Sequence, residues 1–130
     1  MTEEIIEGNK LIAIFCGAKP CKDWQGYDGF EHDSYYHLQW SNKYQDNLDL
    51  FSYRHSELKY DTSFDWIIPA IKKAYDLIQE AENKYPEDLP LDDPRGWRAW
   101  SYRRPNLSID IESTWKSLVR FIQWYNDTKN

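Results

Sequence analysis

Four of the six arginines of this chain lie within residues 95–104, in a segment that also contains tryptophan and tyrosine. A guanidinium group binds phosphate through two parallel hydrogen bonds, and aromatic rings stack on flat ligands. The segment therefore favours binding of a phosphorylated ligand with rings, such as a nucleotide. We predict ligand contacts from a set that we call the arginine strip, namely Arg95, Trp97, Arg98, Trp100, Tyr102, Arg103 and Arg104.

The arginine strip has a second interpretation. If residues 97–103 form a β-strand, alternate side chains point to opposite faces, and each face carries both charge and rings. Alternatively, the rings pack on helices and the arginines pair with Asp88, Asp92, Asp93 or the acidic surfaces of the helices, because surface ion pairs are common and contribute little to stability. Ligand binding requires guanidinium groups that are exposed and without carboxylate neighbours.

Four residues have a spacing close to that of zinc fingers. Cys16, Cys21, His32 and His37 form C-x4-C-x10-H-x4-H, which supplies a complete tetrahedral set. However, Cys16 ends a hydrophobic segment where a core side chain is expected, and no finger helix is evident. A buried, inert Cys16 is the favoured interpretation, so no cofactor is predicted. In a reducing compartment both cysteines remain thiols.

Acidic residues and histidines also occur together in a way that would suit hydrolysis. Glu31, His32, Asp33, His37 and His55 include the carboxylate and imidazole groups of a proton shuttle. No Gly-x-Ser-x-Gly elbow, P-loop or HExxH motif accompanies them. We interpret them as solvated loop residues and do not expect an enzyme.

The composition predicts one globular domain that spans residues 1–130. The chain is 41% hydrophobic and 17% aromatic, which is enough for one core without disulfides. Its formal charge of −6 disfavours binding to duplex nucleic acid. No apolar run approaches the ~20 residues that cross a bilayer, and the N-terminus is acidic where a secretory signal would be basic. A cytoplasmic location is therefore expected.

Three helices are predicted from apolar periodicity and capping residues. The clearest covers residues 111–125, with Asp110 as its N-cap. A second, amphipathic helix covers residues 63–83, with Pro69 expected in its first turn because proline lacks an amide donor.

The third helix would begin after Thr2 and end at Gly17. Residues 12–15 within it fit a strand equally well.

The segments between these helices predict strands. Residues 34–40 and 47–53 are rich in aromatic residues and are predicted to form a hairpin. Residues 97–103 and 107–109 are two further predicted strands. Residues 85–94 read as a connector inside one domain. The expected fold class is α+β, a layered helix/sheet sandwich with a small, mainly antiparallel sheet and about three helices.

Three segments, residues 9–17, 60–73 and 111–126, together resemble the phage ABA sandwich family of small phage and prophage proteins. The most specific parts of the likeness are Phe64-Asp65-Trp66-Ile67-Ile68-Pro69 and Phe121-Ile122-Gln123-Trp124-Tyr125-Asn126. The resemblance implies helices layered about a sheet and a phage origin, and it carries over no catalytic residue. The aromatic middle region and the arginine strip are not part of the family pattern, so a specific function could have been added there.

These observations predict two alternative functions. The first is a non-enzymatic phage accessory protein that binds a small phosphorylated ligand, such as a nucleotide signal of host defence, and sequesters it in the host cytoplasm. The alternative is an inhibitor that binds a host protein through the same aromatic and arginine residues. Because a ligand-sequestering protein can build its site between subunits, a homo-oligomer is expected for the first function. Trp66 and Trp115 are expected in the core, which leaves as contact candidates Trp24, Trp40, Trp97, Trp100 and Trp124.

Overall fold

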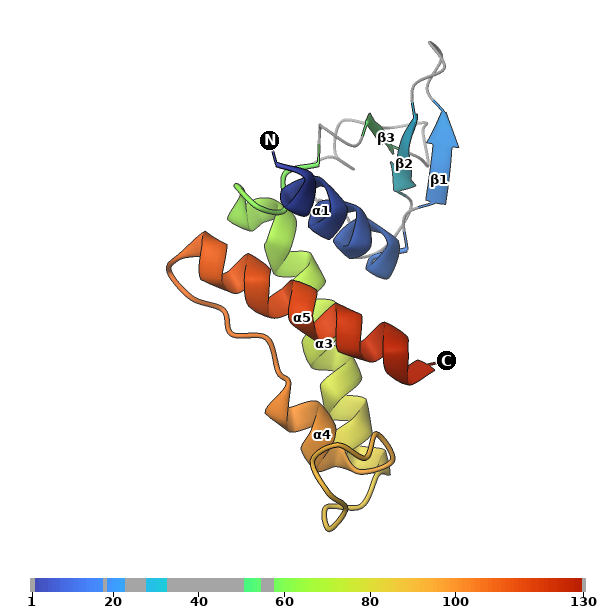
Figure 1. The fold of residues 1–130 in the computed structure, drawn as a ribbon, viewed down its shortest axis with the longest axis vertical. Helices are drawn as coiled ribbons and strands as arrows, with labels where there is room; N and C mark the ends of the chain where they lie inside the picture. Colours follow the sequence, from blue (N-terminus) through green and yellow to red (C-terminus); the bar gives the residue numbers. More distant parts are fainter. Residues whose placement is uncertain (1, 18, 23–27, 33–50, 55–57, 130) are drawn as a thin grey trace. The chain divides into compact units, whose positions relative to one another are not determined.

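The computed structural model describes residues 2–17, 19–22, 28–32, 51–54 and 58–129 (Figure 1). The helices among them are α1 (Glu3–Phe15), α3 (Phe64–Lys84), α4 (Trp97–Tyr102) and α5 (Ile111–Lys129). The strands are β1 (Lys19–Lys22), β2 (Asp28–His32) and β3 (Phe51–Arg54). The chain divides into two compact units, Met1–Ala70 and Ile71–Asn130, and the boundary falls inside α3.

The predicted α+β layered sandwich is wrong, because helices dominate the described fold. α1, α3 and α5 have 13, 21 and 19 residues, whereas the three strands have 4, 5 and 4. The segments 97–103 and 107–109, predicted as strands, form α4 and an irregular connection to α5. The described residues of the second unit therefore contain helices and connecting segments but no strand.

The three short strands belong to the first unit and form one antiparallel sheet in the order β1-β2-β3. In its register Lys19 lies opposite Glu31, and His32 lies opposite Phe51. Of the predicted hairpin, residues 34–40 and 47–50 lie outside the described residues. Residues 51–53 are part of β3, whose partner is β2.

Helix α1 begins and ends where the capping residues predict. Thr2 is the N-cap, and its Oγ1 accepts a hydrogen bond from the Ile5 N–H at 3.3 Å. After the helix, Gly17 has a φ of 92°, in the left-handed region that glycine adopts without a steric penalty, and its N–H donates to the Ile14 carbonyl at 3.0 Å. Residues 12–15 are helical, so the strand interpretation is wrong.

The core of the first unit includes a polar side chain, Asn9, which is fully buried. Its Nδ2 donates to the Leu58 carbonyl at 3.2 Å and to Asp61 Oδ1 at 2.9 Å. These bonds join α1 to the segment that leads into α3, and they avoid the penalty of ~1–3 kcal/mol for an unsatisfied buried polar group. Among the described residues of this unit, the buried apolar side chains are Ile12, Ala13, Phe15, Cys16, Leu58, Tyr60, Trp66, Ile67 and Ala70. The core positions predicted for Cys16 and Trp66 are confirmed.

Helix α3 matches the predicted helix over residues 63–83 to within one residue at each end. Its buried side chains recur at helical spacing and include Ile67, Ile71, Ala74 and Ile78. The place predicted for Pro69 is wrong, because Pro69 lies inside the helix and not in its first turn. The helix begins earlier than proline alone would indicate, since the Ser63 carbonyl accepts hydrogen bonds from the amides of Trp66 and Ile67, both at 3.1 Å.

Helix α4 replaces a predicted strand because its burial pattern suits a helix. Ala99 is fully buried, and Trp100 is 8% exposed. The Trp100 ring meets the Trp124 ring edge-on with centroids 5.2 Å apart, and its Nε1 donates to the Pro94 carbonyl at 3.0 Å. Aromatic residues favour strands only through their packing context, so the packing decides the conformation. In Figure 1, α4 lies beside the C-terminal end of α3.

Helix α5 begins at the predicted cap. Asp110 Oδ1 accepts a hydrogen bond from the Glu112 N–H at 3.1 Å, and its Oδ2 accepts one from Ser113 Oγ at 2.8 Å. The helix continues to Lys129, beyond the predicted end at 125. Its buried side chains are Thr114, Trp115, Leu118, Phe121 and Ile122. The predicted core role of Trp115 is confirmed.

Candidate functional site

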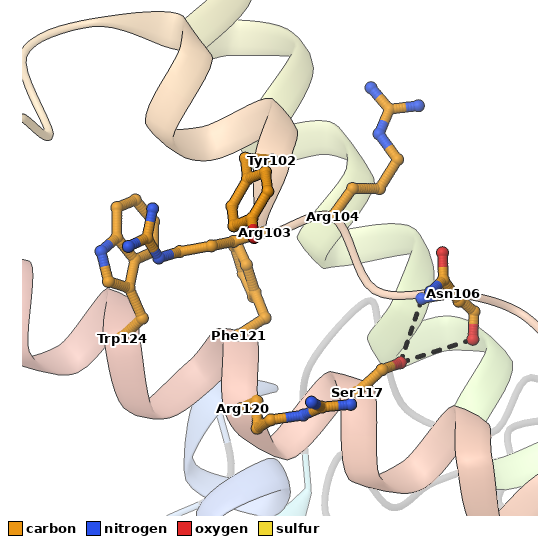
Figure 2. Close-up of a pocket in the computed structure, with 8 residues that line it drawn as sticks. All are labelled: Tyr102, Arg103, Arg104, Asn106, Ser117, Arg120, Phe121 and Trp124. Carbon is orange, nitrogen blue, oxygen red and sulfur yellow. Dashed lines mark hydrogen bonds between the residues drawn. The ribbon is translucent and has the colours of Figure 1, made fainter. Parts of the chain in front are cut away.

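The helical second unit contains a pocket of about 460 Å³ between the end of α4, the segment that follows it and α5 (Figure 2). Three arginines and three aromatic rings contribute to it. The lining residues are Tyr102, Arg103, Arg104, Asn106, Ser117, Arg120, Phe121 and Trp124. None of these described lining residues is acidic, and the volume is within the range of small-molecule sites.

Arg103 is held by carbonyl groups and a ring. Its Nη1 donates to the Leu91 carbonyl at 3.0 Å and to the Ala99 carbonyl at 3.2 Å. Its guanidinium carbon lies 4.7 Å from the centroid of the Trp124 ring, and Figure 2 shows the two groups stacked. Carbonyls and rings orient a guanidinium but do not cancel its charge. Its Nε and Nη2 make no hydrogen bond to the described residues, so these donors remain for an anion.

The Arg104 side chain contacts two residues of α3. Its Nη2 pairs with Glu82 Oε1 at 2.8 Å, and its guanidinium carbon lies 5.4 Å from the centroid of the Tyr75 ring. The Tyr75 hydroxyl in turn donates to the Pro105 carbonyl at 2.8 Å. In Figure 2 the Arg104 side chain points away from Arg103 and Arg120. A carboxylate therefore already compensates its charge.

Arg120 projects from α5 and is exposed. It makes no ion pair or hydrogen bond within the part of the chain that the structure describes, and in Figure 2 it lies on the opposite side of the pocket from Tyr102. Beside it, Ser117 Oγ accepts a hydrogen bond from the Asn106 N–H at 3.0 Å. This contact holds the segment after α4 on α5, so the pocket wall is fixed near Arg120.

Arg95 lies outside this pocket and is paired. Its backbone N–H and Nε both donate to Asp93 Oδ1 at 3.0 Å, and its Nη2 donates to Asp93 Oδ2 at 2.8 Å. These hydrogen bonds, chiefly that from the side chain, lower the pKa of Asp93 to about 2 and raise the pKa of Arg95. The predicted alternative of internal pairing is thus confirmed for Arg95, through Asp93, and for Arg104, through Glu82 on the surface of α3.

The remaining members of the arginine strip also lie outside the pocket. Arg98 is exposed and makes no ion pair with the described residues, Trp97 is half-buried, and Trp100 belongs to the core. The prediction of two strand faces is wrong, because successive side chains of α4 are rotated by about 100° and not by 180°. Only Tyr102, Arg103 and Arg104 of the strip meet in the pocket.

Five lining residues were not part of the predicted site, namely Asn106, Ser117, Arg120, Phe121 and Trp124. Trp124 was among the predicted contact candidates. Arg120 carried a weaker signal, since it falls on the polar side of the amphipathic helix 111–125. Its place in the same pocket as Arg103 depends on how α5 packs against α4, which the sequence does not display.

The other two candidate sites fall partly outside the described residues. For the zinc set, Cys16 is buried at the C-cap of α1, Cys21 lies in β1, His32 lies in β2, and His37 is outside the described residues. The described part of the chain contains no group of three or more potential metal ligands. The zinc set and the acid/base set, of which Asp33 and His55 are also outside, stay untested.

No protein-family model, curated protein or solved structure matches this chain. The likeness to the phage ABA sandwich family therefore stays a prediction. Within the described ranges, none of the helices combines the length and the apolar character needed to span a bilayer.

Proposed function

We propose that this protein binds a small phosphorylated ligand in the pocket of the second unit without catalysing a reaction. The observation that carries the proposal is that Arg103 and Arg120 line one pocket and pair with no carboxylate among the described residues. Hydrogen bonds between charged groups are about twice as strong as neutral ones, so two uncompensated guanidinium groups favour an anion.

The aromatic residues favour a nucleotide over a simple anion. Tyr102 is 72% exposed at the pocket, so its ring can stack on a base. Trp124 lies under Arg103 and orients that guanidinium through a cation–π contact. We propose that the phosphate binds the arginines and that the base stacks on Tyr102.

Binding alone suffices for a biological role of this kind. The resemblance to a phage family extends the proposal to a phage accessory protein that sequesters a nucleotide signal of host defence in the host cytoplasm. Sequestration needs affinity and no nucleophile, and the Ser117 hydroxyl in the pocket is already engaged with Asn106.

Removal of Arg120 tests the proposal. A panel of linear and cyclic nucleotides is titrated by thermal shift and calorimetry, and a ligand of the folded state raises Tm with concentration. We expect Arg120→Ala to weaken binding about 10- to 100-fold, since a hydrogen bond to a charged group contributes ~1.5–3 kcal/mol. Arg120 is the suitable target because it is exposed and makes no hydrogen bond or ion pair with the described residues.

The matched control is Arg98→Ala, which removes the same charge from an exposed site outside the pocket. It should leave the affinity unchanged. Equal losses in both variants would indicate general electrostatic attraction and contradict the pocket. A wild-type protein whose Tm no nucleotide raises would contradict the proposed function itself.

The second candidate function is direct inhibition of a host protein. It is favoured by exposed apolar side chains on the same unit, namely Tyr102, Leu107 at 52% and Ile109 at 100%. Exposed aromatic and aliphatic groups near arginine are typical of protein interfaces. This function predicts no response to the nucleotide panel, so the same titration separates the two candidates.

A further inference from the structure

The three arginines of the pocket differ in how much positive charge they can offer. Arg103 and Arg120 have no carboxylate partner among the described residues, whereas Arg104 pairs with Glu82 at 2.8 Å. Two uncompensated charges match the charge of one phosphate monoester, which is between about −1.5 and −2 at pH 7. A diphosphate would bring additional charge that the pocket leaves unmatched.

We propose that the pocket selects ligands with a single phosphate over diphosphates, and that Glu82 determines this selectivity by holding the Arg104 guanidinium against α3 and compensating its charge. The inference rests on the proposed function, because it concerns the ligand class of the same site. Glu82 contacts Arg104 and does not line the pocket, so it determines specificity indirectly, through the position of the Arg104 guanidinium.

The contacts of Arg104 explain why it is held outward. Its guanidinium lies between the Glu82 carboxylate and the Tyr75 ring, both on α3. The Tyr75 hydroxyl also anchors the next residue through the Pro105 carbonyl. The backbone thus remains in place when the ion pair is removed, and the Arg104 guanidinium alone gains freedom to turn toward Arg103 and Arg120.

The ion pair is suited to this role because it is partly exposed. The Arg104 and Glu82 side chains are 46% and 33% exposed. Ion pairs in such settings contribute little to folding stability, so removing the Glu82 charge should change the charge of the pocket far more than the stability of the fold.

The experiment compares affinities for AMP and ADP, with inorganic phosphate and pyrophosphate as probes that do not depend on the base. The wild-type protein should bind each monophosphate more tightly than the matching diphosphate. In Glu82→Gln we expect the preference to shift about tenfold toward ADP and pyrophosphate, because Arg104 becomes the third available cation. Glu82→Ala should shift it in the same direction, and circular dichroism verifies that both variants fold.

The matched control is Glu80→Gln, which makes the same charge change two residues away on α3, outside this pocket. It should leave the ratio of the two affinities unchanged. An unchanged ratio in both Glu82 variants, an equal shift in Glu80→Gln, or a wild-type protein that does not prefer monophosphates would overturn this inference while leaving the proposed function in place. If none of the four probes and no other nucleotide binds, both fail.

Discussion

At the scale of single residues, four arginines that are close in sequence have three kinds of surroundings. Arg95 and Arg104 are paired with carboxylates, Arg103 is held by carbonyls and a ring, and Arg98 is exposed without an ion pair among the described residues. A charge is available to a ligand only where no internal carboxylate compensates it. Within this group, only Arg103 combines an uncompensated charge with a place in the pocket.

The pair of Asp93 and Arg95 predicts a pH dependence. The pKa of Asp93 is lowered from its ordinary value of 3.8 to about 2 by hydrogen bonds from Arg95. A lowered carboxyl pKa stabilises the folded protein above the unfolded value, so this contribution is present above about pH 4 and is lost as the pH falls toward about 2. An NMR titration of the Asp93 carboxyl should show this midpoint, and Arg95→Gln should return it toward 3.8.

Arg98→Gln serves as the control for that titration, because it removes a nearby charge that makes no hydrogen bond to Asp93. The Asp93 midpoint should not change in this variant. A wild-type midpoint near 3.8 would show that the two side chains do not pair in solution.

At the scale of elements, α4 depends on its surroundings more than the other helices do. It has six residues, and isolated helices shorter than ~12–15 residues are marginal in water. Its position depends on the buried Ala99 and Trp100 and on a close approach at its start. A Cβ atom at Gly96 would lie 2.7 Å from Leu89 Cβ and 3.3 Å from the Pro86 carbonyl oxygen.

Gly96→Ala should therefore destabilise the protein by about 1–3 kcal/mol, the usual range for overpacking. The strain arises because the Trp97 N–H donates to the Pro86 carbonyl at 3.1 Å, so the two segments cannot separate without loss of that bond. Urea unfolding measures the change. In a Leu89→Gly background the added methyl group no longer meets Leu89 Cβ, so the same substitution should be less destabilising. An equal effect in both backgrounds would refute the proposed clash.

At the scale of the whole molecule, the two compact units share α3. The boundary between Met1–Ala70 and Ile71–Asn130 falls within this helix, and buried residues of α3 belong to both units. Unfolding of one unit would leave the other with a shortened helix, and helices are cooperative structures that are stable mainly through packing. The single domain indicated by chain length stays a prediction that unfolding can test.

We expect one cooperative thermal transition, with equal calorimetric and van't Hoff enthalpies. Ile67→Ala in the first unit and Leu118→Ala in the second should each lower the same Tm, since both side chains are fully buried and such truncations usually destabilise by 2–5 kcal/mol. Two transitions, each shifted by only one of the substitutions, would mean that the units are separate domains.

The sequence by itself determined where the long helices lie. The caps at Thr2 and Asp110, the stop at Gly17 and the apolar periodicity of residues 63–83 and 111–125 are local signals, because each acts on residues within one or two turns. The expected core positions of Trp66 in α3 and Trp115 in α5 are confirmed, whereas the buried Phe121 of α5 was not among the expected core residues. The local sequence also marked residues 95–104 as the part of the chain with the densest group of arginines.

Only the tertiary structure decided the fold class and the composition of the site. Aromatic segments favour strands or helices according to what they pack against, and Trp100 packs against Trp124, 24 residues further along the chain. The contacts that decide which arginines are engaged within the protein also join residues that are distant in the sequence. Arg104 contacts Glu82, 22 positions away, and Arg103 contacts Leu91, 12 positions away. Whether a guanidinium is neutralised or free to bind depends on such neighbours, and no local pattern records them.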